Sequence, residues 1–130
     1  MILDTTFLID IMHGDKNAVA KLYELKQRDE PRRITSISIF ELFTGVARCE
    51  KPGTEKLRVQ KSLAAGDVVL LDEISAQIAG LKTGTLMREG ITIKPLDCLI
   101  AGIALSRKET LLTRDMKDFS RIKGLQVESY

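Results

Sequence analysis

The chain has 130 residues, of which 44% are hydrophobic and 29% charged, and this supply of apolar side chains suits one domain with one core. The net charge of +2 is too small to indicate a nucleic-acid partner by itself. The single histidine, His13, nearly excludes mechanisms that need a histidine pair or a serine–histidine dyad. We therefore expect a single domain over residues 1–130.

The sequence gives no sign of a membrane segment or a metal-binding cysteine motif. No stretch approaches the roughly 18 consecutive apolar residues of a membrane span, and the opening MILDTTFLIDIM is too short and too acidic for a secretory signal. Cys49 and Cys98 lack the close spacing of a zinc site, so we expect them to be packing residues. These features predict a cytoplasmic protein without a membrane partner.

The first half of the chain alternates short apolar runs with helical patterns. A strand that stops at Asp4 is followed by apolar residues at helical spacing up to His13, where Gly14 ends the helix. Asp15 is a predicted cap for a helix over 16–28. A second strand is expected over 32–37, then a helix over 38–49 with two apolar stripes, and then a charged helix from Thr54 to about Ala65.

The second half continues the alternation. DVVLLD predicts a third strand over 67–72, and the helix after it should be interrupted at Gly84 and ended at Gly90. The segment 96–105 is apolar almost all round, as in a helix buried against a sheet. Short strands are expected over 110–113 and 125–129. The pattern predicts an α/β fold with a mostly parallel sheet of about five strands and helices on both faces.

Four acids fall at the predicted strand-to-helix junctions: Asp4, Glu41, Asp97 and Asp115. Chemistry in such sheets collects beyond the carboxyl ends of the strands, where the strand order reverses. Carboxylates gathered there would raise one another's pKa unless a cation neutralised them. Oxygen ligands favour Mg²⁺ or Mn²⁺ over zinc, and these ions commonly bridge to substrate phosphates. The acids therefore predict a metal site for phosphodiester chemistry.

Each acid also has a structural explanation when it is taken alone. Asp4 and Asp97 could be helix N-caps, and Glu41 fits the far end of a Ser-x-x-Glu capping box that begins at Ser38. Asp115 and Asp118 could form a surface turn with the neighbouring basic residues. Setting the four acids aside would leave 14 acidic against 20 basic residues, a surface that tolerates a polyanion.

Four segments, ILDTTFLID, SISIFELFTG, PLDCLIAGIAL and LLTRDMKDF, resemble PIN-domain ribonucleases in their order and over essentially the whole chain. The length and layout more narrowly resemble the toxin half of VapBC-type toxin–antitoxin pairs. The resemblance implies a PIN-like three-layer α/β/α fold, hydrolysis of RNA with Mg²⁺ or Mn²⁺, a homodimer and inhibition by an antitoxin.

The resemblance also assigns roles to individual residues. The family's acidic quartet falls on Asp4, Glu41, Asp97 and Asp115, Thr113 matches a usual hydroxyl residue, and Asp118 matches a frequent additional acid. Thr6 stands where the family often has Asn or Ser. The basic residues beside the acids are candidate phosphate contacts: Lys94, Arg114 and Lys117. We further expect an antitoxin peptide to lie between two helices, one carrying Phe7, Leu8, Ile11 and Met12 and the other Ile39, Phe40, Leu42, Phe43 and Val46.

Other functions remain open at the level of the sequence. A degenerate PIN domain would only bind RNA or a partner. A phosphoacceptor receiver domain would use Asp72, but paired acids after the first strand are missing. A phosphatase of the haloacid dehalogenase type would need a second Asp where the chain has Thr6.

Overall fold

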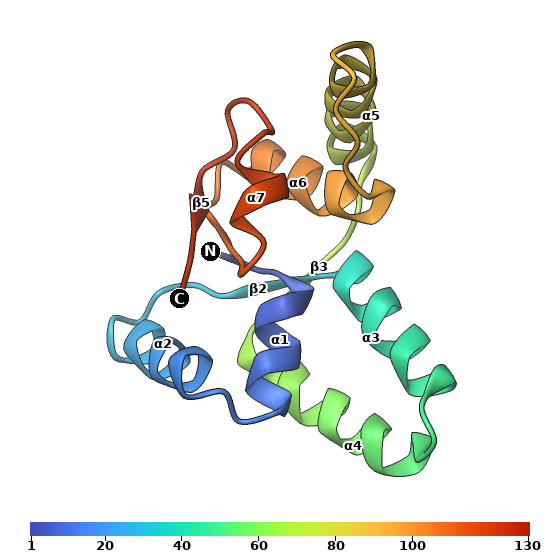
Figure 1. Ribbon diagram of the computed structural model, residues 1–130. Coiled ribbons are helices and arrows are strands. Elements are labelled where there is room, and N and C mark those ends of the chain that lie inside the picture. The colour runs from blue at the N-terminus through green and yellow to red at the C-terminus, as the bar shows by residue number, and fades with distance from the viewer.

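The computed structural model describes residues 1–130, and its centre is a five-stranded sheet in the order β3-β2-β1-β4-β5 (Figure 1). The strands are β1 (Ile2–Leu3), β2 (Arg33–Thr35), β3 (Asp67–Val69), β4 (Leu111–Leu112) and β5 (Val127–Glu128). All four pairings are parallel. The predicted α/β class and strand number are confirmed.

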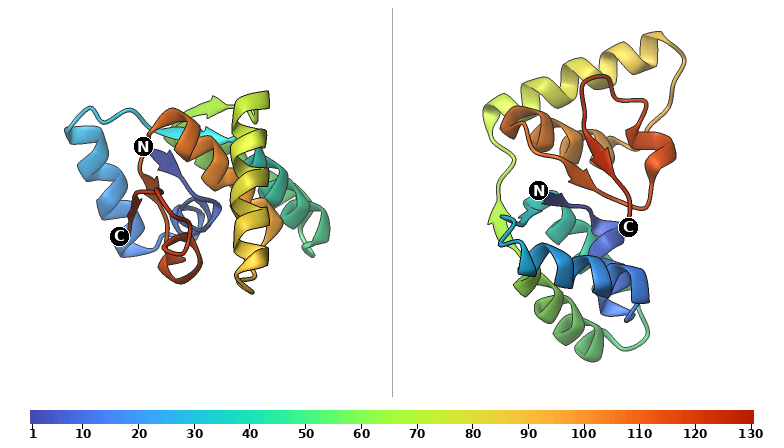
Figure 2. Two further views of the ribbon diagram at one scale, coloured as in Figure 1. Left: turned by 90° about the horizontal axis from the view of Figure 1, so that it is seen from above. Right: turned by 90° about the vertical axis from the view of Figure 1, so that its left-hand side faces the viewer.

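Helices cover both faces of this sheet. On one face lie α1 (Thr5–Met12), α2 (Lys16–Gln27), α3 (Ser36–Arg48) and α4 (Pro52–Ser62), and on the other lie α5 (Glu73–Arg88), α6 (Pro95–Arg107) and α7 (Met116–Phe119) (Figure 2). A short 3₁₀ turn, Leu63–Ala65, follows α4. No helix has the length and apolar content needed to cross a membrane.

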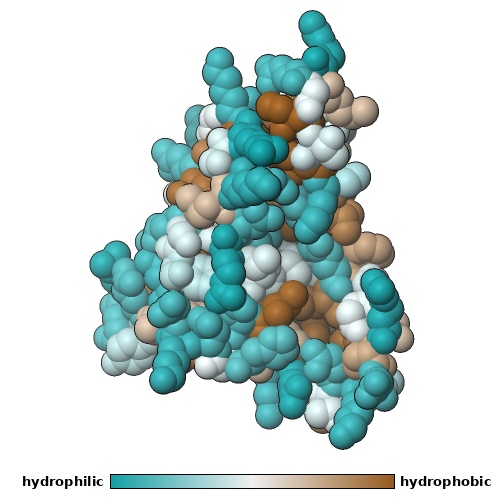
Figure 3. Space-filling model, viewed as in Figure 1, coloured by the Kyte–Doolittle hydropathy of each residue, from teal (hydrophilic) through white to brown (hydrophobic).

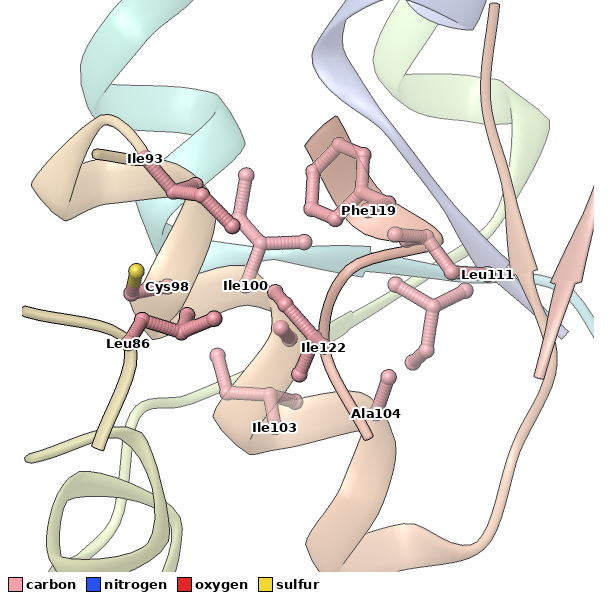
Figure 4. Packing of buried hydrophobic residues seen from close by; sticks show 11 residues of the cluster. Leu86, Ile93, Cys98, Ile100, Ile103, Ala104, Leu111, Phe119 and Ile122 are labelled. Carbon is pink, nitrogen blue, oxygen red and sulfur yellow. The ribbon is translucent and has the colours of Figure 1, made fainter. Parts of the chain in front are cut away.

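The strands are buried on both sides, so neighbouring residues belong to different cores. Ile2 and Leu111 pack with the buried residues of α5, α6 and α7 (Figure 4), whereas Leu3 and Leu112 pack with those of α1 to α4. Successive side chains of a strand point to opposite faces, which produces this division. The short apolar runs of the sequence are therefore central strands of a three-layer α/β/α fold.

Two helices approach unusually closely on the α5 face. A Cβ built on Gly102 of α6 would stand 2.5 Å from the backbone oxygen of Ser75 and 2.7 Å from Cβ of Ala79, both in α5. Only glycine allows this contact. The close packing holds α6 firmly, and with it the first turn that carries Asp97.

Several predicted boundaries need correction. Helix α3 starts at Ser36 with Thr35 as its N-cap, because the Thr35 hydroxyl accepts a hydrogen bond from the Ser38 backbone N–H at 2.9 Å. Helix α4 begins at Pro52, since proline suits the first helical turn. Helix α5 continues through Gly84, and Gly90 with φ of +72° follows its end.

Other expectations hold. His13 is the C-cap of α1, and Asp15 caps α2 by accepting from the Ala18 N–H at 3.0 Å. Cys98 is buried in the α5–α7 core, and Cys49 is half-buried at the end of α3; both are free thiols.

Candidate metal centre

The strand order reverses beside β1. The chain moves outward from β1 to β2 and β3, and then returns to place β4 on the other side of β1. Asp4 follows β1 and Thr113 follows β4, so both lie at this switch point, where α/β sheets place ligands.

Asp4 is almost completely buried, with 2% of its surface exposed. It occupies the N-cap position of α1, but its side chain makes no capping hydrogen bond, so the cap explanation is wrong. Its Oδ2 instead accepts hydrogen bonds of 2.7 Å from the hydroxyls of Thr6 and Thr113. Both donors use the same oxygen, and Oδ1 accepts no hydrogen bond, which leaves it available to a ligand.

Asp97 lies in the first turn of α6 and is 8% exposed. The N-cap of this helix is Lys94, so the alternative explanation of Asp97 as a cap is wrong. Burial, followed by the charges of Asp4, Glu41 and Asp115, raises the pKa of Asp97 to about 6 against the opposing charge of Lys94. Such a carboxyl group gains strongly from a bound cation.

Glu41 comes from the middle of α3 and reaches toward α1, where its carboxylate accepts a hydrogen bond from the Thr5 hydroxyl. The capping box is excluded because Ser38 lies inside the helix. Burial raises the pKa of Glu41, while the Thr5 hydrogen bond lowers it; the Asp4 charge raises it and the Lys94 charge lowers it. Glu41 and Asp97 thus share an electrostatic environment with Asp4.

Asp97, Asp115 and Asp118 form the tightest group of acids. One carboxylate oxygen from each lies within 4.8 Å of the others. Asp115 is also the N-cap of α7, because it accepts from the Asp118 backbone N–H at 3.2 Å. Asp115 therefore lies in a turn, but neither Arg114 nor Lys117 forms an ion pair with it, and the same turn brings Asp115 and Asp118 to Asp97.

The three predicted basic contacts have different surroundings. Lys94 is exposed and lies near enough to lower the pKa of both Asp97 and Glu41. Lys117 is exposed and forms no ion pair. Arg114 is paired with Asp10 and Asp15, at 2.9 and 3.3 Å, on the side of α1 and α2.

The donor set fits a hard divalent ion. Every candidate ligand is a carboxylate oxygen, with no histidine or thiol among them, and such ligands suit Mg²⁺ or Mn²⁺. The raised pKa values of Asp97 and Glu41 have the same causes, first burial and then the negative charges of neighbouring acids, and a cation would oppose both effects.

Some groups at the site leave little or no signal in the sequence. The Thr5 hydroxyl, adjacent to Thr6 in DTT, supports Glu41, and the doubled hydroxyl after Asp4 is the signal that could have identified it. The pairing of Arg114 with Asp10, and the contact of Asp10 with Tyr130, leave no local sequence signal because the residues are far apart in the chain. The short helix α7 was not predicted from the sequence.

Asp72, the phosphoacceptor of the receiver alternative, is the N-cap of α5. Its carboxylate accepts from the Ser75 N–H at 2.8 Å, and it follows β3 at the sheet edge, away from the switch point. The structure therefore gives this residue a structural role.

Comparison with known proteins agrees with this architecture. The PIN domain family model matches residues 1–125. A tRNA(fMet)-specific endonuclease VapC of Shigella flexneri is 27% identical over 128 residues, which is 98% of this chain and 96% of that protein. The protein of the same name from Salmonella typhimurium is 30% identical over 97 residues, covering 75% of this chain and 74% of that protein.

Solved structures show the same fold. The DNA-bound VapBC complex of Salmonella typhimurium contains a chain with a TM-score of 0.89 at 26% identity, covering 98% of this chain and 96% of that one. A chain of VapBC2 from Rickettsia felis, bound to promoter DNA, gives 0.92 at 24% identity, covering 99% and 97%. The chain therefore belongs to the PIN-domain family and is similar over nearly its whole length to VapC proteins.

Proposed function

We propose that this chain is a metal-dependent endoribonuclease and the toxin of a VapBC-type toxin–antitoxin pair. The observation that carries the proposal is the meeting of Asp97, Asp115 and Asp118 within 4.8 Å at the switch point, beside the buried Asp4. The ligands would be Asp4, Glu41, Asp97 and Asp115, with Asp118 as an additional ligand, and the ion Mg²⁺ or Mn²⁺.

The ion would supply a Lewis acid for a phosphate oxygen and a water of lowered pKa, so that no histidine base is needed. The protein's own contribution is to fix the carboxylates. Thr6 and Thr113 orient Asp4, and Thr5 orients Glu41. Locked ligand geometry of this kind keeps a site selective and competent.

Substrate would be held by the exposed cations nearest the acids. Lys94 lies at the start of α6 and Lys117 in α7, and neither is committed to an ion pair. Phosphate contacts position a nucleic acid without reading its sequence. We therefore assign RNA backbone binding to Lys94 and Lys117.

Initiator tRNA is the first substrate to test, because both curated relatives described above are named for tRNA(fMet) cleavage. Purified protein with Mn²⁺ should cleave initiator tRNA and leave an elongator methionine tRNA intact. Cleavage of neither RNA, or of both equally, would contradict the assignment of initiator tRNA as the substrate. The proposal that the chain is a nuclease would then be tested with other RNAs.

The burial of side chains in α1 and α3 reduces the number of residues that could contact an antitoxin. Phe7, Leu8, Leu42 and Val46 are buried in the core between the sheet and α1 to α4, so they are not available to a partner. Phe40 is 59% exposed and Phe43 is partly exposed on α3.

Apolar side chains gather on the surface where α1 and α3 lie (Figure 3). We propose that an amphipathic antitoxin segment binds over this exposed face of α3, next to Glu41. Its presence there would cover the acids and exclude RNA.

We also infer a homodimer from the family resemblance. Large apolar side chains remain exposed on the edge of the sheet and on α5, namely Leu70, Ile74 and Leu81. Isolated apolar residues are common on surfaces, but such a group suits an interface. Sedimentation of the purified protein should give the mass of two chains, and Leu81→Glu should shift it toward one.

Expression in a bacterial host tests the toxin assignment. Growth should stop when the chain is expressed alone and resume when the neighbouring reading frame is co-expressed. Asp4→Asn should relieve the arrest, whereas Asp67→Asn, an exposed acid in β3, should not. Harmless expression of active protein would contradict the toxin role.

A further inference from the structure

Arg114 lies two positions after the end of β4 and connects this segment to α1 and α2. One Nη atom of its guanidinium lies 2.9 Å from a carboxylate oxygen of Asp10 in α1 and 3.3 Å from one of Asp15, the N-cap of α2. This single side chain therefore ties the segment after β4 to two helices.

Tyr130 adds a second tie at the same place. Its hydroxyl donates a hydrogen bond to Asp10, and its ring meets the buried ring of Phe7 edge-on with centroids 4.8 Å apart. The Arg114 guanidinium lies 5.6 Å from the Tyr130 ring centroid, within the range of a cation–π contact. Tyr130 therefore contacts α1 through both its hydroxyl and its ring.

The hydroxyl of Tyr130 is held as a donor. Burial raises the pKa of Tyr130, and its hydrogen bond to Asp10 and the charge of Asp10 raise it further. Asp10 thus accepts from a tyrosine and pairs with an arginine, so its orientation is fixed from two directions.

Backbone N–H groups of the same segment donate hydrogen bonds at the candidate metal centre. The Arg114 N–H donates to the Thr6 hydroxyl at 3.3 Å, and the Asp115 N–H donates to the Thr113 hydroxyl at 3.0 Å. Both hydroxyls in turn donate to Asp4 Oδ2. The segment 113–115 therefore has its side-chain anchor on one side and the candidate ligands on the other.

We propose that Arg114 and Tyr130 are positioning residues that hold segment 113–115 against α1 and so fix Asp4 and Asp115 for the divalent ion. This inference rests on the proposed function. It gives Arg114 a role different from the phosphate contact expected from the sequence, since its guanidinium is engaged with Asp10, Asp15 and Tyr130.

The Arg114 anchor should affect the geometry of the site more than the stability of the fold. An exposed ion pair contributes at most about 1 kcal/mol, and the Arg114 side chain is 54% exposed. Shared anchoring by two carboxylates and an aromatic ring nevertheless restricts the backbone of 113–115. Metal ligands need placement within about 0.5 Å, so loss of the anchor should affect metal binding more than folding.

The sign of the change in Mn²⁺ affinity separates positioning from simple electrostatics. Arg114→Met removes a positive charge near the acids, and charge alone would make Mn²⁺ bind more tightly. Positioning predicts the opposite, a loss of affinity of about threefold to tenfold, because the ligands become less ordered. Tyr130→Phe changes no charge and should weaken Mn²⁺ binding in the same direction.

We suggest measuring Mn²⁺ affinity by electron paramagnetic resonance, with urea unfolding of the same samples. Arg121→Met is the matched control, because Arg121 is an exposed arginine after α7 without an ion pair. The control should leave Mn²⁺ affinity unchanged. Unchanged or tighter Mn²⁺ binding by Arg114→Met would overturn the proposal, as would a loss of affinity that merely follows global unfolding.

A second measurement tests the phosphate-contact alternative. RNA binding should be followed against salt concentration with Ca²⁺ in place of a catalytic ion. Removing a phosphate contact lowers the salt dependence by about 0.7 for single-stranded RNA, whereas loss of a positioning residue leaves the slope unchanged. A lowered slope for Arg114→Met would overturn the proposal.

The measurement of Mn²⁺ affinity does not depend on RNA cleavage. A wild-type protein that binds Mn²⁺ but cleaves no RNA would therefore contradict only the proposed nuclease function.

Discussion

The Thr113 hydroxyl donates a 2.7 Å hydrogen bond to Oδ2 of Asp4, across 109 positions of sequence. It joins the ends of β4 and β1 where the strand order reverses. Thr113 is fully buried, and its hydroxyl also accepts from the Asp115 N–H. One side chain therefore orients two of the proposed metal ligands.

Thr113→Val should test this role. The variant keeps the shape of the side chain but leaves Asp4 and the Asp115 N–H each short of a partner, at a cost of about 1–3 kcal/mol in the free energy of unfolding. Mn²⁺ affinity and RNA cleavage should both fall by about tenfold. Thr110→Val, which loses only an exposed hydrogen bond to Gln126, is the control. Equal behaviour of the two variants would remove Thr113 from the site.

The raised pKa of Asp97 predicts that the stability of the metal-free protein depends on pH. Its pKa is about 6 in the folded state and about 3.9 when unfolded, so the folded state binds the extra proton between these values. The contribution of Asp97 to the free energy of unfolding should therefore be greatest below pH 4. It should fall as the pH rises to 6, by at most about 3 kcal/mol.

Asp97→Asn should remove that loss. Urea unfolding in EDTA at several pH values should show wild type and variant diverging between pH 4 and 6, with the variant more stable at pH 7. A constant difference across this range, or a variant less stable at pH 7, would contradict the raised pKa of Asp97 and favour a purely structural carboxylate.

Glu41→Gln separates charge from hydrogen bonding on α3. Glutamine can still accept from the Thr5 hydroxyl, so the free energy of unfolding should change by less than about 1 kcal/mol. A metal ligand loses its charge, and Mn²⁺ affinity should fall by tenfold or more. Glu50→Gln, an exposed acid after α3, serves as the control. Unaltered Mn²⁺ binding in Glu41→Gln would take this residue out of the ligand set.

Phe40→Ser tests the proposed antitoxin face. Because Phe40 is 59% exposed, its loss should leave folding nearly unchanged, but growth arrest should persist when the neighbouring reading frame is co-expressed. Tyr23→Ser, at 64% exposure on α2, should still be neutralised by the partner. Equal neutralisation of both variants would exclude the exposed face of α3.

The sequence was sufficient for the alternation of strands and helices and for the approximate position of each element. The apolar strand segments Ile2–Leu3 and Leu111–Leu112 could be identified because buried parallel strands need unbroken hydrophobic segments. Boundaries were less accurate where several residues could cap a helix. Thr35 caps α3 in place of Ser38, since both side chains have the hydroxyl that an N-cap needs.

The site was predictable only in part for a physical reason. Asp4 and Asp115 could be identified because junctions after parallel strands converge. The prediction of such a junction is wrong for Glu41, in the middle of α3, and for Asp97, whose helix α6 follows α5 and no strand. The groups that orient the acids are set by tertiary contacts. Tyr130 reaches Asp10 across 120 positions, and Arg114 turns away from the acids that adjoin it in sequence. Local patterns contain no information on such long-range pairing.

RNA cleavage measured against Mn²⁺ concentration, for wild type beside Asp4→Asn, tests the central claim most directly. The variant keeps the side-chain size and an oxygen acceptor for Thr6 and Thr113, but removes a buried negative charge. We predict cleavage by wild type that rises with Mn²⁺ and disappears in EDTA, and no cleavage by Asp4→Asn at any Mn²⁺ concentration. Equal cleavage by both proteins, or wild-type cleavage that persists in EDTA, would contradict a metal-dependent nuclease centred on Asp4.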